Sequence, residues 1–162
     1  MKFKMLIITL VLIIDILSKQ MVVHTMLEEE SINIINNFFS ITYAKNTGVA
    51  FSFLDGKVPL IIIATSIIIL LILRHMKANK LSKCEGIFYS LVIGGSLGNL
   101  IDRIVYGYVI DFLDFNIFGY NFAIFNLADT AIVIGIFGLI ILSFIESRNE
   151  DETNSKRKEK NR

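Results

Sequence analysis

The chain has 162 residues, 54% of them hydrophobic, with a net charge of +1 and a mean hydropathy of +0.63. Its apolar residues fall in four blocks, which excludes an ordinary soluble domain and predicts one integral membrane domain. Because Cys84 is the only cysteine, the chain can form neither an intramolecular disulfide nor a cysteine-rich metal site. The sequence also has no cluster of basic and aromatic residues that would indicate nucleic-acid binding.

Four transmembrane spans are predicted in chain order, at about residues 3–23, 56–75, 84–103 and 126–146. The first could be mistaken for a signal peptide, but it contains Asp15 and Lys19 and lacks a small-residue cleavage site, so we expect an uncleaved span. Small residues interrupt the third span, which favours packing against other helices. The spans form a predicted membrane domain over residues 1–147. The charged residues 148–162 are predicted to be a disordered cytoplasmic tail.

The basic residues predict how these spans are oriented. An even number of spans puts both termini on one side, and twelve of the sixteen Lys and Arg residues then fall on that side. The positive-inside rule therefore places both termini in the cytoplasm.

A short β element is predicted between the first two spans. Residues 36–54 alternate in part between apolar and polar side chains and are interrupted near Asn46-Thr47-Gly48, a turn sequence. Residues 107–125 have a similar mixture of aromatic residues, Gly and Asn. We expect a small extracytoplasmic sheet at the membrane surface.

Polar residues gather at one depth of the predicted bundle. Asn126 is a natural N-cap for the fourth span, Asp129 suits the positive end of its helix dipole, and Asp15 and Lys19 suit an ion pair from which Lys19 snorkels. Nine such groups nevertheless share the outer half of the spans or the outer surface, which predicts a site facing inward from the bilayer. They are Asp15, Lys19, Asn46, Asn99, Asp102, Arg103, Asp111, Asn126 and Asp129.

Paired carboxylates are the chemistry that this set favours. The sequence has no HExxH motif and its two histidines, His24 and His75, fall on opposite sides of the membrane, which disfavours zinc hydrolysis. A Ser/Lys dyad would require Ser96 to approach Lys19, because Ser18 points elsewhere on the helix. Two neighbouring aspartates can share a proton and activate water, and Asp111 and Asp129 are the natural pair.

Three functions are compatible with intramembrane carboxylates at this stage. An aspartyl hydrolase would use the pair for acid–base chemistry, and an ion- or proton-coupled carrier would use the same groups for transport. A non-catalytic membrane assembly subunit would tolerate the loss of both carboxylates.

Five motifs in order resemble the signal peptidase II family, the bacterial lipoprotein signal peptidases, over essentially the whole chain up to the charged tail. The motifs are Asp15–Lys19 (DILSK), Asn46–Phe51 (NTGVAF), Gly95–Arg103 (GSLGNLIDR), Gly107–Phe112 (GYVIDF) and Phe125–Asp129 (FNLAD). Two positions depart from the family pattern: Val49 stands where a small residue is usual, and Ala123 where a proline is frequent.

The resemblance implies a fold of four transmembrane helices, a small extracytoplasmic β cradle and a loop or short helix over the active site. It implies a membrane aspartyl endopeptidase without metal or cofactor, with Asp111 and Asp129 as catalytic residues. Supporting or substrate-binding residues would be Asn46, Gly48, Asn99, Arg103, Asn126 and Ala128. Structural polar residues would be Asp15, Lys19 and Asp102.

The substrates implied are prolipoproteins whose cysteine carries diacylglyceryl, cleaved just before that cysteine. The enzyme would be a monomer in the bacterial cytoplasmic (inner) membrane, in contact with membrane lipids and with its active site at the extracytoplasmic face. Cyclic-peptide inhibitors of the family would also be expected to bind.

Overall fold

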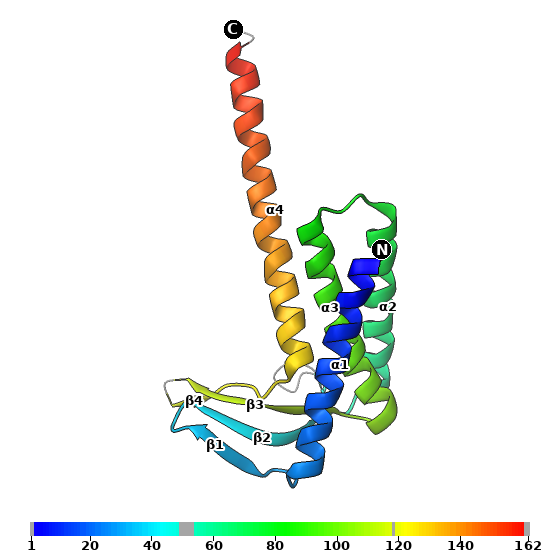
Figure 1. The fold of residues 1–162 in the computed structure, drawn as a ribbon, viewed down its shortest axis with the longest axis vertical. Helices are drawn as coiled ribbons and strands as arrows, with labels where there is room; N and C mark the ends of the chain where they lie inside the picture. The colour runs from blue at the N-terminus through cyan, green and yellow to red at the C-terminus, as the bar shows by residue number, and fades with distance from the viewer. Residues whose placement is uncertain (1, 49–53, 118, 161–162) are drawn as a thin grey trace.

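The computed structural model describes residues 2–48, 54–117 and 119–160, which form four helices and a small sheet (Figure 1). The helices are α1 (Lys2–Thr25), α2 (Val58–Ala78), α3 (Lys83–Tyr106) and α4 (Leu127–Lys160). The strands are β1 (Ser31–Ile35), β2 (Phe39–Asn46), β3 (Val109–Ile117) and β4 (Tyr120–Asn121). The sheet lies across one end of the helical bundle, while α1 begins and α4 ends away from it (Figure 1).

All four helices are long and apolar enough to cross a membrane, which confirms the predicted number of membrane-length helices. In α4 the apolar segment is Leu127–Asn149. Large apolar side chains on the outer surfaces of α1, α2 and α4 are exposed, as expected for surfaces that contact lipid.

Helix α3 is the central helix and packs against the other three. Its small residues permit this, as the sequence predicts: a Cβ added at Gly95 would lie 2.3 Å from the Ala128 carbonyl oxygen, and one at Gly98 would lie 2.4 Å from Asp15 Oδ2. The helix begins with a capping box between Ser82 and Glu85 and ends at Gly107, whose φ of +80° favours glycine.

The sheet is antiparallel with strand order β1-β2-β3-β4. Strand β2 ends at Asn46, where the turn sequence predicts an end, and β3 and β4 fall within the predicted segment 107–125. Strand β1 precedes the predicted segment and was missed. Between β2 and α2 the described residues 47–48 and 54–57 contain no helix; residues 49–53, with Val49, lie outside the described residues.

A buried apolar cluster joins the end of α1 to the sheet. It contains Val22, Met26, Tyr43, Ile110 and Phe112. Because Ile110 and Phe112 flank Asp111 on β3, this cluster fixes the position of that aspartate relative to α1.

The prediction of a disordered tail from Arg148 was wrong for the described residues. Helix α4 continues without interruption to Lys160 and extends beyond the other helices (Figure 1). Residues 148–160 contain no Gly or Pro and are rich in Glu, Lys and Arg, which have high helix propensity. The membrane span already supplies the helix nucleus, so elongation requires no apolar face.

Candidate active site

The two predicted catalytic aspartates are linked through one buried amide. Asp111 lies on β3 and Asp129 in the first turn of α4, with Asn126 fully buried between them. Asn126 Nδ2 donates to Asp111 Oδ1 at 2.7 Å, and Asn126 Oδ1 accepts from the Asp129 backbone N–H at 2.8 Å. The Asn126 N–H donates in return to Asp129 Oδ2 at 3.3 Å, so Asn126 is the predicted N-cap and also orients both carboxylates.

The second oxygen of each carboxylate is held by another asparagine. Asn46 Nδ2 donates to Asp111 Oδ2 at 2.9 Å, and Asn99 Nδ2 donates to Asp129 Oδ1 at 2.6 Å. Asn46 Oδ1 also accepts from the Gly48 N–H at 2.9 Å, which fixes the orientation of its amide. The structure thus brings the three predicted asparagines and both aspartates into one hydrogen-bonded set.

Asp111 has the electrostatics of an acid–base group. Burial raises the pKa of its carboxyl to about 7, and the neighbouring charge of Asp129 adds to the rise. The donors on Asn46 and Asn126, and the charge of Lys19, lower this pKa and partly oppose the effect. A carboxyl that titrates near neutral pH can give or take a proton under physiological conditions.

Arg103 places its guanidinium near the carboxylates of Asp111 and Asp129. Its Nη1 donates to the Asn99 carbonyl at 3.3 Å and its Nη2 donates to the Gly48 carbonyl, which ties α3 to the end of β2. The side chain is buried, and its Nε has no hydrogen-bond partner within the described residues. Its charge acts on Asp102, Asp111 and Asp129.

Lys19 is the centre of a second buried network behind the aspartates. Its Nζ lies 2.8 Å from Asp15 Oδ2 and 2.9 Å from Asp102 Oδ2, and it donates to Asn99 Oδ1 at 3.0 Å. The predicted Asp15–Lys19 pair is therefore confirmed, but the predicted snorkelling is wrong, because Lys19 is only 1% exposed. Helix packing against α3 encloses the ammonium instead.

This network reaches the residue before each of the two predicted catalytic aspartates. Asp15 Oδ1 accepts from the Ala128 N–H at 3.0 Å, and Asp102 Oδ2 accepts from the Ile110 N–H at 3.3 Å. Ala128 was predicted as a site residue, whereas Ile110 was missed because it acts through its backbone. Asp102 thus binds a backbone group of β3, the strand that follows α3.

The alternative chemistries find little support in this geometry. Ser18 Oγ donates to the Asp15 carbonyl at 2.8 Å, and Lys19 Nζ is occupied by two carboxylates and an amide, which disfavours a Ser/Lys dyad. His24 ends α1 beside the sheet, whereas His75 lies in the last turn of α2. Across residues 2–48, 54–117 and 119–160 no three His, Cys, Asp or Glu residues are grouped to hold a metal ion.

A bundle of four membrane-length helices with a carboxylate site at one end has the architecture of a multi-pass membrane enzyme. Two solved bacterial membrane enzymes, determined by the in meso method, share this fold. The first has a TM-score of 0.86 and 36% identity, covering 92% of both chains. The second has a TM-score of 0.80 and 37% identity, covering 88% of this chain and 92% of the other.

Sequence comparisons identify the family. The family model for signal peptidase (SPase) II matches residues 7–145. The lipoprotein signal peptidase of Staphylococcus haemolyticus is 41% identical over 143 residues, covering 88% of this chain and 90% of the relative. That of Photorhabdus laumondii is 42% identical over 150 residues, covering 88% and 87%. The chain belongs to the signal peptidase II family, a family of peptidases, which confirms the resemblance of the five motifs.

Proposed function

We propose that this protein is an aspartic endopeptidase that removes the signal peptide from diacylglyceryl-modified prolipoproteins by cleaving just before the lipidated cysteine. Membership of the signal peptidase II family supports the reaction. The observation that carries the mechanism is the connection of Asp111 and Asp129 through the Asn126 amide, because it holds two carboxylates in one buried, low-dielectric site.

In the proposed mechanism the two aspartates share one proton. The ionised carboxylate takes a proton from water as the water attacks the scissile carbonyl, and the protonated carboxyl donates to the carbonyl oxygen. On collapse of the tetrahedral intermediate the C–N bond breaks, the amine that leaves takes a proton from the dyad, and one hydroxyl of the intermediate returns a proton to the dyad as the new carbonyl forms. Asn46, Asn99 and Asn126 keep the carboxylates oriented during these transfers. The buried guanidinium of Arg103 places a positive charge near both carboxylates.

The depth of the site supports a lipidated substrate. The dyad lies at the junction of the sheet with the first turn of α4, so a scissile peptide can reach it while acyl chains remain in the bilayer. Together with the excess of basic residues at the other end, this supports an extracytoplasmic site and cytoplasmic termini in the bacterial inner membrane. We propose that the monomer is active and needs no metal or cofactor.

The purified protein is expected to cleave a diacylglyceryl-modified prolipoprotein and to leave the unmodified precursor intact. Mass spectrometry of the product should place the new N-terminus at the modified cysteine. Equal cleavage of both precursors would contradict the proposed lipid requirement. Solute-dependent ion flux in liposomes without a peptide product would instead support a carrier.

The rate of cleavage is expected to fall as the pH rises above about 7, because the dyad then loses the proton carried by Asp111. The Asn46 amide stabilises the ionised carboxylate, so its removal in Asn46→Ala raises the pKa and should move the alkaline limb to higher pH. The measurement is kcat/KM against pH. Asn33→Ala on β1 is the control and should leave the limb in place. A shift of the Asn46→Ala limb to lower pH would contradict the assignment.

A further inference from the structure

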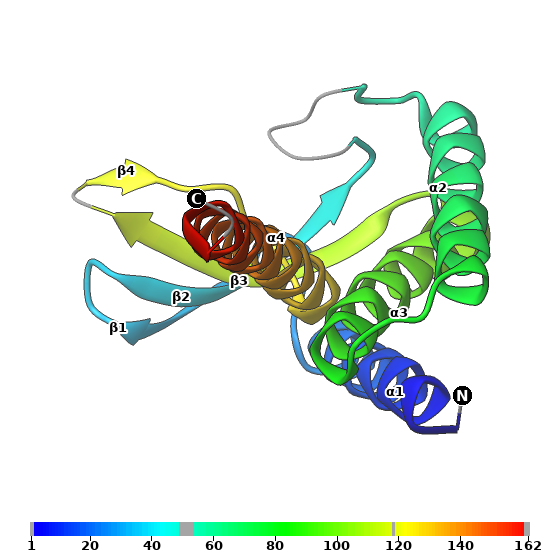
Figure 2. The same ribbon diagram turned by 90° about the horizontal axis from the view of Figure 1, so that it is seen from above.

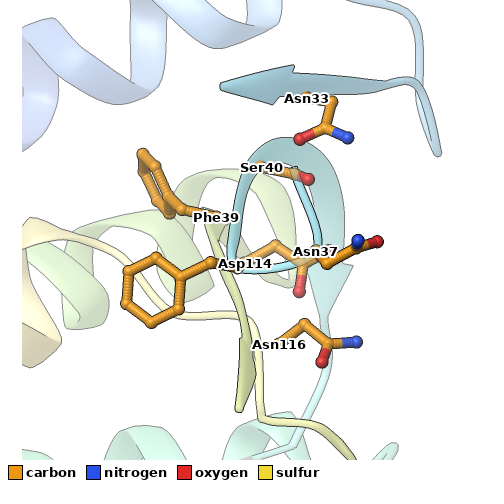
Figure 3. A pocket seen from close by; sticks show the side chains of 7 residues that line it. Asn33, Asn37, Phe39, Ser40, Asp114 and Asn116 are labelled. Carbon is orange, nitrogen blue, oxygen red and sulfur yellow. The ribbon is translucent and has the colours of Figure 1, made fainter. Parts of the chain in front are cut away.

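A group of polar side chains lies near the β1–β2 turn, on the face of the sheet opposite to Asp111. Asn33, Ser40 and Asp114 lie side by side on β1, β2 and β3. With Asn37 and Asn116 they line a polar cavity of about 210 Å³. Figure 3 shows these polar groups on one side, with the ring of Phe39 directed away from them. Asp114 is three residues from Asp111 on the same strand, so the two carboxylates point to opposite faces.

The β3–β4 hairpin has a different surface, which is apolar and exposed. Ile117 is 41% exposed, Tyr120 80% and Phe122 48%. Residues 115–128 of the sequence contain no Asp, Glu, Lys or Arg. In Figure 1 the hairpin projects sideways from the lower end of α4, and the view from above in Figure 2 shows β4 on the side of α4 away from α1, α2 and α3.

We infer that the hairpin side chains Ile117, Tyr120 and Phe122 insert into the interfacial region of the bilayer. We call this surface the hairpin anchor; the chain leads from it directly into the α4 span. Phe122 precedes the start of α4 by only five residues, so the chain holds it at the depth where that span enters the membrane. Val133 and Phe137, in the second and third turns of α4, are also apolar and exposed.

The amino-acid composition of the anchor is typical of side chains at the membrane interface and not of side chains exposed to water or bound to a charged partner. Tyrosine and phenylalanine are favoured at the interface, where an aromatic ring meets hydrocarbon and a phenol hydroxyl can remain hydrated. An exposed β hairpin in water ordinarily carries charged residues that prevent association, and the end of this hairpin, residues 115–122, has none. The polar cavity on the opposite face faces solvent in this arrangement.

The anchor gives strand β3 a second attachment to the membrane. Asp111 and Ile117 lie on this one strand, about 20 Å apart at 3.3 Å per residue. On the proposed function, the anchor would hold the strand of Asp111 at a fixed depth relative to a lipidated substrate.

Tryptophan fluorescence tests the anchor without reference to activity. The chain contains no Trp, so Tyr120→Trp introduces a single reporter at the hairpin, and Asn33→Trp introduces one beside the polar cavity. Both full-length variants are reconstituted without substrate into phosphatidylcholine–phosphatidylglycerol vesicles, with and without bromine on the acyl chains. We expect Tyr120→Trp to emit at shorter wavelength than Asn33→Trp and to be quenched by the brominated lipid. Asn33→Trp should remain unquenched.

Each other outcome overturns the inference. Emission and quenching at position 120 equal to those at position 33 would leave the hairpin in water. Short-wavelength emission without bromine quenching would assign the surface to a protein contact, such as a second copy of the chain. Quenching that appears only after a prolipoprotein is added would assign it to the substrate. The fluorescence measurement is made without substrate, so its result does not depend on whether the protein cleaves prolipoproteins.

Discussion

Asp129→Asn is expected to abolish cleavage of a diacylglyceryl-modified prolipoprotein while the fold is retained. The amide cannot take the proton from water or carry the shared proton, and loss of acid–base catalysis costs roughly 10²–10⁴ in rate. The substitution has nearly the same shape and removes a charge beside Asp111, but its amide accepts only one of the two hydrogen bonds that Asp129 accepts, so the free energy of unfolding should change by no more than about 1 kcal/mol. Asp111→Asn is expected to have the same effect. Rates measured on purified protein, with circular dichroism of the helices, check both results.

Asp114→Asn is the matched control for this prediction. Asp114 lies on the same strand as Asp111 and accepts a hydrogen bond from Thr42 at 2.9 Å, but it is on the opposite face. The Asp114→Asn variant should cleave the substrate at close to the rate of the unsubstituted protein. Undiminished cleavage by Asp129→Asn would exclude the proposed dyad, and equal losses in all three variants would indicate a general effect on the sheet.

Sequence reasoning located the site because its residues fall at positions that topology brings together. Asp111 on β3 and Asp129 in the first turn of α4 belong to consecutive parts of the chain, joined through β4, and Asn126 just before α4 is a recognisable N-cap. The third span contributes Asn99 through a helix whose small residues indicate close packing. The order of the spans alone therefore predicts a common location for these groups.

The parts that sequence reasoning missed depend on packing depth or on the backbone. Helical spacing predicts that Asp15 and Lys19 meet, but only the packing of α1 on α3 decides that the ammonium is enclosed. The Ile110 N–H carries no side-chain signal. Strand β1 does alternate over its first residues, but it is short and follows an acidic run, Glu28–Glu30. The charged end of α4 has the composition of a disordered tail, although its residues also have high helix propensity.

Lys19→Met is expected to be the most destabilising single change in the buried network. The substitution keeps the approximate length of the side chain but removes the ammonium between Asp15 and Asp102, leaving two buried carboxylates unpaired. Breaking a buried ion pair by removal of one partner costs about 3–5 kcal/mol. Cleavage should fall as well, because Asn99, the Ala128 N–H and the Ile110 N–H all depend on this network. Chemical unfolding in detergent micelles measures the change in free energy.

Two further variants test whether the loss of stability in Lys19→Met comes from the two unpaired buried carboxylates or from the loss of any lysine. Lys45→Met removes a partly exposed pair with Glu28 and should change stability little, because exposed ion pairs are screened by solvent. In Lys19→Met with Asp102→Asn, one of the two unpaired charges is neutralised, so part of the lost stability should return. Equal unfolding of Lys19→Met and Lys45→Met would show that the ammonium contributes nothing specific. A double variant less stable than Lys19→Met would show that unpaired charge is not the cause of the loss.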